Sequence, residues 1–305
     1  PYLREMGVDY LYLNPIFEAH SNHRYNTADY LNVDPLLGTN EEFEVLCREA
    51  AKYGIGIVLD GVFSHTGSDS RYFNREGRYG DGGAYRDPSS PYRSWYDFDP
   101  KYKGGYRSWW GFETLPEVNE ETPSFVEFIT GEGGVIDTWL RRGAAGFRLD
   151  VADELPDDFI EKIRAAVKRV SPEKFLLGEV WEDATTKYGF GQRRTYLLGK
   201  GLDSVMNYPF KNAVLDFVKG KPAQQAMGEI LSICEHYPAP AMDTALNFLS
   251  THDTERALTV IADEPANGRG REWQSGRCVT GEAYEEGMLR LRMAYAIIYT
   301  LPGVP

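Results

Sequence analysis

The chain has 305 residues, with 33 basic and 46 acidic side chains and a net charge of −13. This charge would repel a phosphate backbone, and no cluster of Lys and Arg interrupts it, so we exclude nucleic acid as a partner. The longest apolar runs, at 54–58 and 294–299, are far shorter than the roughly 18 residues of a membrane span, so we exclude a membrane as well.

Short apolar segments alternate along the chain with longer amphipathic ones, a pattern typical of βαβ units and a parallel sheet. The length alone allows one large barrel or two smaller domains. We expect strands at 8–14, 56–63, 145–151, 175–180, 204–208 and 245–249. We expect helices at 41–53, 125–142, 156–170, 210–219, 222–236 and 283–299. Pro156 at a helix start and Gly54 and Gly143 after helix ends support these boundaries.

Residues 66–121 interrupt the alternation. This stretch is rich in Gly, Arg and Asp and contains ten aromatic residues between Tyr85 and Phe112. A disordered linker lacks aromatics, so we expect an ordered insertion that lines a binding cleft. For Trp109 and Trp110 there are two alternatives: they line sugar subsites in this cleft, or they pack inside the insertion. An aromatic ring face can stack on a pyranose ring and can equally pack in a hydrophobic core.

The strand count predicts an incomplete (β/α)8 barrel. Six strands do not close an eight-stranded barrel, and the chain opens in what we expect to be a helix end at 1–6, without an initiator Met. It stops at 300–305, where a further strand should begin. We therefore expect a fragment lacking the first strand and most of the eighth. Its predicted domains are a first barrel part at 1–65, an inserted loop domain at 66–121 after the third barrel strand, and a second barrel part at 122–305.

Cysteine usage gives a prediction about the compartment. Cys47, Cys234 and Cys278 are odd in number and lack metal-ligand spacing, so the sequence predicts neither a disulfide framework nor a Cys-based metal site. This pattern favours a reducing compartment such as the cytoplasm.

Acidic and His side chains follow four of the predicted strands, in segments 60–65, 146–151, 178–181 and 249–253. In α/β barrels the carboxyl ends of strands carry the catalytic groups. These four segments are therefore the expected positions of catalytic residues.

Three carboxylates at these strand ends favour a catalytic site. Arg148 and Asp150 share one strand face, so we expect the guanidinium to hold the carboxylate ionised and nucleophilic. Apolar neighbours favour the protonated form of Glu179, which suits a proton donor. Taken singly, each has a structural alternative: an ion pair, a helix cap or surface glutamate, and for His252 and Asp253 a buried hydrogen bond.

The four segments, in this order, resemble the signature regions of the alpha-amylase family of glycoside hydrolases, family 13. The resemblance runs from the segment VDYLYLNPIF at 8–17 to the approach to the eighth strand. It is most similar to the neopullulanase and cyclomaltodextrinase branch, through LPEVN at 115–119, RLDVADE at 148–154 and GEVWEDA at 178–184.

The resemblance implies roles for individual residues. Asp150 matches the nucleophile, Glu179 the general acid/base, and Asp253 the carboxylate that fixes the sugar and stabilises the transition state. The residues matching groups that hold the glucose at the cleavage point are Tyr25, His65, Arg148 and His252, with Asp60 as a supporting residue beneath them.

The implied activity is retaining hydrolysis of α-1,4-glucosidic bonds in malto-oligosaccharides, starch, pullulan or cyclodextrins. Val151, which follows the nucleophile position, occurs in members that also accept α-1,6 bonds. Two alternatives stay open: a transglycosylase or debranching enzyme of the same family, and a sugar-binding fragment without activity. Members of this branch often form homodimers through an N-terminal domain, so a homodimer of the full-length protein is also open.

A structural calcium ion in this family is often bound by an asparagine immediately before the histidine that matches His65. Ser64 occupies that position, and a lone hydroxyl is a poorer ligand for a hard cation than a carbonyl or carboxylate oxygen. We therefore expect neither this metal site nor an organic cofactor. Calcium elsewhere stays open through Asp69, Asp81 and Asp87, which are otherwise solvated loop residues.

Overall fold

A computed structural model describes residues 1–263, 266 and 268–305 of the chain. The chain divides into two compact units, one of Pro1–Glu179 with Gly189–Leu202 and one of Val180–Tyr188 with Asp203–Pro305. No helix in these described parts is long and apolar enough to cross a membrane.

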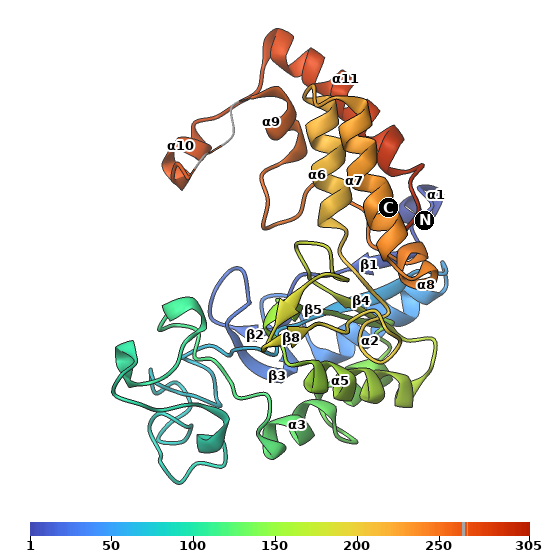
Figure 1. Cartoon of the computed structure of the whole chain (residues 1–305). Coiled ribbons are helices and arrows are strands. Elements are labelled where there is room, and N and C mark those ends of the chain that lie inside the picture. The colour runs from blue at the N-terminus through green and yellow to red at the C-terminus, as the bar shows by residue number, and fades with distance from the viewer. Residues whose placement is uncertain (264–265, 267) are drawn as a thin grey trace. The chain divides into compact units, whose positions relative to one another are not determined.

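The first unit is built on a parallel sheet whose strand order is β1-β4-β5-β6 (Figure 1). Its strands are β1 (Tyr10–Tyr12), β4 (Gly56–Gly61), β5 (Gly146–Leu149) and β6 (Phe175–Gly178). Apart from Asp60 and Arg148, the side chains of the central strands β4 and β5 are apolar and buried on both faces, so these strands read as nearly continuous apolar runs. This sheet confirms the strands predicted near 8–14, 56–63, 145–151 and 175–180.

Helices connect the strands of the first unit. They are α1 (Tyr2–Glu5), α2 (Asn40–Ala51), α3 (Pro123–Thr130), α4 (Val135–Arg141), the 3-10 turn η4 (Ala152–Glu154) and α5 (Asp157–Val170). Thr39 and Glu42 cap the start of α2 reciprocally. The prediction of a single helix at 125–142 is wrong, because the helical conformation is interrupted between Thr130 and Val135. Helix α3 ends where the backbone of Gly131 becomes extended, with φ −67° and ψ 169°, and Gly133 follows with a φ of +73°. The apolar periodicity continues on both sides and hides this break.

A short hairpin was missed by the sequence patterns. Strand β2 (Phe17–Ala19) pairs antiparallel with β3 (Thr27–Val33), and the register shifts twice within three pairs. This irregular pairing leaves no alternation to recognise. The connection between these strands carries Tyr25, so the hairpin positions one of the predicted site residues.

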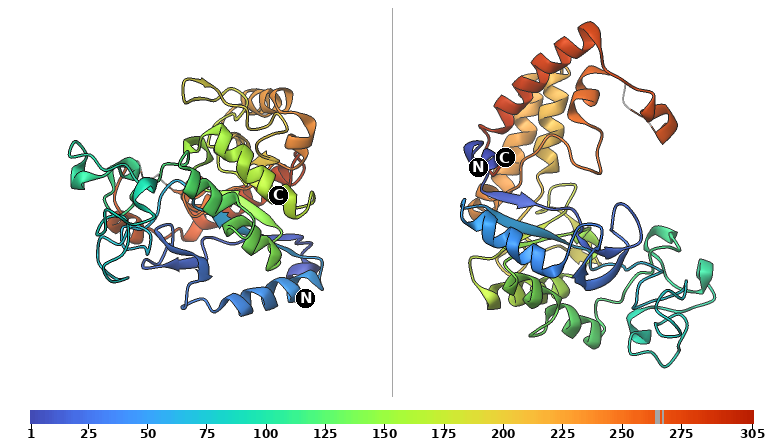
Figure 2. Two further views of the ribbon diagram at one scale, coloured as in Figure 1. Left: turned by 90° about the horizontal axis from the view of Figure 1, so that it is seen from below. Right: turned by 180° about the vertical axis from the view of Figure 1, so that it is seen from behind.

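The segment 66–121 between β4 and α3 is ordered but irregular, as predicted. Figure 2 shows it as a folded loop segment without long helices or strands. It contains three single 3-10 turns: η1 (Arg93–Trp95), η2 (Lys103–Gly105) and η3 (Trp109–Gly111). Its interior is aromatic, with Phe73 and Tyr106 ring centroids 4.6 Å apart and both side chains buried. Packing of aromatic side chains, rather than pairing of β-strands, therefore stabilises this segment.

The second unit is mainly helical. Its elements are β9 (Ser204–Val205), α6 (Tyr208–Val218), α7 (Ala223–His236), α8 (Ala239–Asp243), α9 (Ala257–Ala262), α10 (Arg271–Ser275) and α11 (Gly281–Ile298). Helices α6, α7 and α11 lie side by side in Figure 1. The short strands β7 (Tyr188–Gly189) and β8 (Gln192–Arg193) lie where the chain passes between the units.

Two predicted strands of the second unit are shorter than expected. The strand at 204–208 ends at Val205, because the Asn207 side chain accepts a hydrogen bond from the Phe210 amide and caps α6. The strand at 245–249 is reduced to Leu246, which forms single parallel bridges to Met206 and Val304.

Candidate active site

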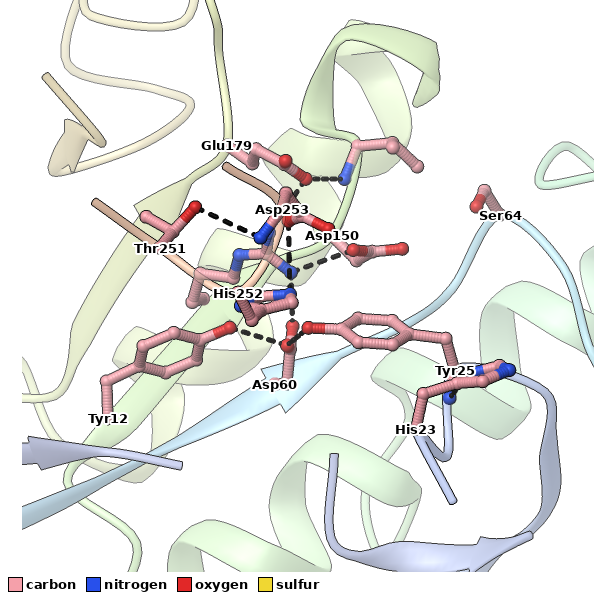
Figure 3. Close-up of polar contacts among 12 residues, drawn as sticks. Tyr12, His23, Tyr25, Asp60, Ser64, Asp150, Glu179, Thr251, His252 and Asp253 are labelled. Atoms are coloured by element: carbon pink, nitrogen blue, oxygen red, sulfur yellow. Dashed lines mark hydrogen bonds and ion pairs between the residues drawn. The ribbon is translucent and has the colours of Figure 1, made fainter. Parts of the chain in front are cut away.

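One buried guanidinium holds three carboxylates at the ends of three neighbouring strands. Arg148 on β5 is fully buried. Its Nη1 lies 2.7 Å from Oδ1 of Asp60 and 2.8 Å from Oδ1 of Asp150, and its Nη2 lies 2.8 Å from Oε2 of Glu179. Figure 3 shows the three acids converging. The structure thus brings together four predicted residues from three strands that are far apart in sequence.

The sheet register explains why Asp150 and Glu179 lie close together. Leu149 on β5 pairs with Gly178 on β6, so the two acids follow paired positions on adjacent strands. Neighbouring strands are about 4.8 Å apart. The Glu179 amide also donates to the Leu149 carbonyl at 3.0 Å, which extends the ladder to the acid itself.

Burial dominates the electrostatics of Asp150. Desolvation raises the pKa of this carboxyl well above its ordinary value, and the negative charges of Asp60 and Glu179 raise it further. The Arg148 guanidinium acts in the opposite direction, as predicted. The net direction nevertheless differs from the expectation that Arg148 would simply hold Asp150 ionised, because one cation is shared among three buried acids.

In the turn after β5, a backbone amide donates a hydrogen bond to the Glu179 side chain. The Val151 amide donates to Oε2 of Glu179 at 2.8 Å. Val151 has φ +40° and ψ +50°, in the left-handed region that a β-branched residue rarely adopts. Such strain costs about 1–2 kcal/mol and persists where the surroundings enforce it. The strained turn therefore fixes both Asp150, which precedes it, and the orientation of Glu179.

This strain predicts an unusual order of stability for two substitutions. We expect Val151→Gly to be more stable than Val151→Ala by about 1 kcal/mol, because only glycine adopts the left-handed region without a steric penalty. Chemical denaturation of both variants measures the difference. The matched control is Ala152→Gly, at the buried position that follows Val151. Here we expect glycine to lower the free energy of unfolding. A Val151→Ala variant more stable than Val151→Gly would contradict the left-handed assignment.

Two tyrosines support Asp60, Tyr12 from β1 and Tyr25 from the connection between β2 and β3. The hydroxyls of Tyr12 and Tyr25 donate to the same Oδ2 of Asp60, at 2.6 and 2.8 Å (Figure 3). Burial and the charge of Asp60 raise the pKa of both phenols, so both stay protonated donors. Tyr25 was predicted as a site residue and Tyr12 was missed. Its signal was available, since it lies near the end of the strand predicted at 8–14, and it ends the observed β1.

His65 is held as a neutral ring. Its Nε2 lies 3.1 Å from the Tyr25 carbonyl, which only accepts, so Nε2 carries the proton. Its Nδ1 then accepts from the Ser64 hydroxyl at 2.9 Å. Burial lowers the pKa of His65 to about 4, consistent with a neutral donor at physiological pH.

The Ser64 position does not fit a calcium ion. The buried Ser64 hydroxyl is directed to His65, and within residues 1–263, 266 and 268–305 no three His, Cys, Asp or Glu side chains group to hold a metal. Asp69 instead faces Arg78 at 3.6 Å, and Asp87 accepts hydrogen bonds from Ser89. We assign no step of chemistry to a metal.

His252 and Asp253 belong to the second unit and pair with each other there. Nε2 of His252 lies 3.0 Å from Oδ2 of Asp253, and the Asp253 side chain is 41% exposed. The alternative of a buried His–Asp bond is therefore wrong, and the pair is accessible to a ligand.

The chain is similar to known proteins over most of its length. Residues 1–275 match the family described as "Alpha amylase, catalytic domain". The chain is 39% identical over 297 residues to an amylopullulanase of Thermoanaerobacterium saccharolyticum, covering 87% of this chain and 22% of the relative. It is 34% identical over 278 residues to neopullulanase 2 of Thermoactinomyces vulgaris, covering 88% of this chain and 44% of the relative.

A solved structure shows the same fold. The type III pullulan hydrolase from Thermococcus kodakarensis matches with a TM-score of 0.83 and 29% identity, over all of this chain and 49% of that one. The chain thus spans less than half the length of these three proteins.

Proposed function

The chain belongs to the alpha-amylase family of glycoside hydrolases, and we propose that it hydrolyses α-1,4-glucosidic bonds with retention of configuration. The observation that carries this proposal is the pairing of Asp150 and Glu179 with one Arg148 guanidinium, at 2.8 Å each. Retaining enzymes need two carboxyl groups only about 5–5.5 Å apart, and acids on adjacent, in-register strands suit that spacing.

In the proposed first step, Glu179 donates a proton to the glycosidic oxygen while Asp150 attacks the anomeric carbon. The bond from that carbon to the leaving oxygen breaks, and an ester to Asp150 forms. The Val151 amide donates to Oε2 of Glu179 and Nη2 of Arg148 forms an ion pair with the same oxygen, which favours the transferable proton on Oε1. Arg148 holds Oδ1 of Asp150, so Oδ2 is the attacking oxygen.

In the proposed second step, water attacks the same carbon and Glu179 takes its proton, which releases the sugar and restores both acids. The transition states carry positive charge on the sugar ring. With Glu179 protonated, the Asp60 and Asp150 carboxylates still exceed the single positive charge of Arg148, and this excess negative charge stabilises that cation. By the resemblance, Asp253 contributes a further carboxylate, and Tyr25, His65 and His252 hold the glucose unit.

We propose malto-oligosaccharides, starch, pullulan and cyclodextrins as substrates, with α-1,6 bonds accepted as well. The relatives named amylopullulanase and neopullulanase support both linkages. The parallel sheet of the first unit supports a (β/α)8 barrel, and its division into 1–65, 66–121 and 122–305 stays a prediction. The free thiols of Cys47, Cys234 and Cys278 support a reducing compartment, and a homodimer of the full-length protein stays a prediction.

Product analysis tests this function. Incubation with maltotriose, followed by mass spectrometry and by NMR of the anomeric proton, is expected to give glucose and maltose with the α-anomer formed first. Panose or maltotriose released from pullulan reports the linkage cleaved. Products longer than maltotriose as the main outcome would instead establish a transglycosylase, and no cleavage would leave a sugar-binding protein.

A further inference from the structure

Two tryptophans of the 66–121 segment share one carboxylate. The Trp109 indole donates to Oε2 of Glu154 at 2.6 Å, and the Trp110 indole donates to Oε1 at 2.7 Å. Glu154 ends the turn η4, four residues after Asp150. The segment that follows the proposed nucleophile therefore holds both indoles through the two oxygens of one side chain.

Trp110 is presented to solvent in a constrained conformation. Its residue is 77% exposed, and its backbone has φ +51°, which is uncommon for a residue other than glycine. The two indole rings have centroids 5.7 Å apart. With its only polar atom already bonded to Glu154, the indole of Trp110 offers a ligand chiefly its flat apolar surface. The alternative that Trp110 packs inside the insertion is wrong.

A chain of contacts within the first unit joins these tryptophans to the carboxylate cluster. The Trp109 ring lies 5.3 Å from the His65 ring, between centroids. His65 contacts the Tyr25 carbonyl, and the Tyr25 hydroxyl donates to Asp60. Trp109 therefore lies between the exposed indole of Trp110 and His65, one of the side chains proposed to hold the sugar at the cleavage point.

We propose that Trp109 and Trp110 form a stacking platform for a further glucose unit of the bound α-glucan, and that Glu154 positions this platform. This inference rests on the proposed function and specifies how the substrate is extended. The apolar face of a pyranose complements an indole, and a rigid ring loses little conformational entropy on binding. Because both Glu154 oxygens accept indole protons, Glu154 acts through the tryptophans and is a positioning residue.

A chain-length series tests the platform. Trp110→Ala removes an exposed ring, so folding should be unaffected, which circular dichroism verifies. We expect kcat/KM for maltoheptaose to fall roughly 5- to 10-fold through KM, while kcat/KM for maltotriose changes less than twofold. An equal loss at every length from maltotriose to maltoheptaose, or no loss at any length, would overturn the proposal.

A second variant tests the role of Glu154. In Glu154→Gln one amide oxygen replaces two acceptors, so one indole loses its partner. We expect the same chain-length-dependent rise in KM, and no further rise when Trp110→Ala is added, since both act through one platform. Additive losses in the double variant would overturn the positioning role.

Binding measurements keep this inference separate from the proposed function. Calorimetric titration with maltoheptaose should show weaker binding to Trp110→Ala even if no substrate is cleaved, whereas failure of hydrolysis alone would contradict only the function. The matched control is Tyr2→Ala, a 70% exposed aromatic on α1, before the amino end of β1. It should bind and cleave as the unmodified protein does. Equal binding by Trp110→Ala and the unmodified protein would overturn the platform.

Discussion

Replacing Asp150 by asparagine is expected to lower kcat for maltotriose by roughly 10⁴- to 10⁶-fold, the range seen when a nucleophile is removed from an enzyme. The amide keeps the size of the side chain but cannot form the glycosyl ester. Binding of maltoheptaose should be retained, because Tyr25, His65 and the tryptophans are unchanged. Steady-state kinetics and calorimetric titration of the same preparation measure the two effects separately.

Stability provides the control for this variant. Burial raises the pKa of Asp150 and the neighbouring acids repel its charge, so removing the carboxylate should leave the melting temperature unchanged or raise it. Replacing a residue that serves function rather than stability removes activity without lowering the melting temperature. Activity within tenfold of the unmodified protein would exclude Asp150 as the nucleophile.

Replacing Glu179 by glutamine is expected to lower kcat for oligosaccharides by about 10²- to 10⁴-fold, the contribution of general acid/base catalysis. The expected loss depends on the substrate. An α-glucosyl fluoride, whose leaving group needs no proton, should form the covalent intermediate nearly normally, so that release becomes slow. Azide, a nucleophile that needs no general base, should restore turnover and give glucosyl azide.

A surface glutamate provides the comparison for Glu179. Glu182 is three residues further on and pairs with Lys187, with its side chain 63% exposed. Glu182→Gln should keep kcat within twofold and respond to azide no more than the unmodified protein. If Glu179→Gln lost equal activity on the fluoride and on maltotriose, without rescue by azide, the acid/base role would be excluded.

The sequence patterns predicted the part of the fold that depends on burial of strands. Continuous apolar runs located β4, β5 and β6 because both faces of these strands are covered. The patterns failed where local conformation decides the structure. The β2–β3 hairpin has an irregular register, and the extended backbone of Gly131 ends a helix whose apolar periodicity continues on either side.

The site was predictable to the extent that strand ends determine it. Asp60, Arg148, Asp150 and Glu179 all follow or end strands of one parallel sheet, and they converge on one guanidinium. Contacts between distant loops were not predictable. The bonds of Glu154 to two tryptophans more than 40 residues away depend on how the 66–121 segment folds. The raised pKa of Asp150 depends on burial, which a single sequence does not reveal.

Trapping the covalent intermediate tests the central claim most directly. A fluorinated α-glucosyl fluoride that forms the glycosyl-enzyme rapidly and releases it slowly would be added to the protein, and the digest analysed by mass spectrometry. We predict one hexosyl adduct per chain, on the carboxylate of Asp150, and no adduct on the Asp150→Asn variant. An adduct on another residue, or an active protein that forms no adduct and releases the β-anomer first, would contradict the retaining mechanism proposed for Asp150 and Glu179.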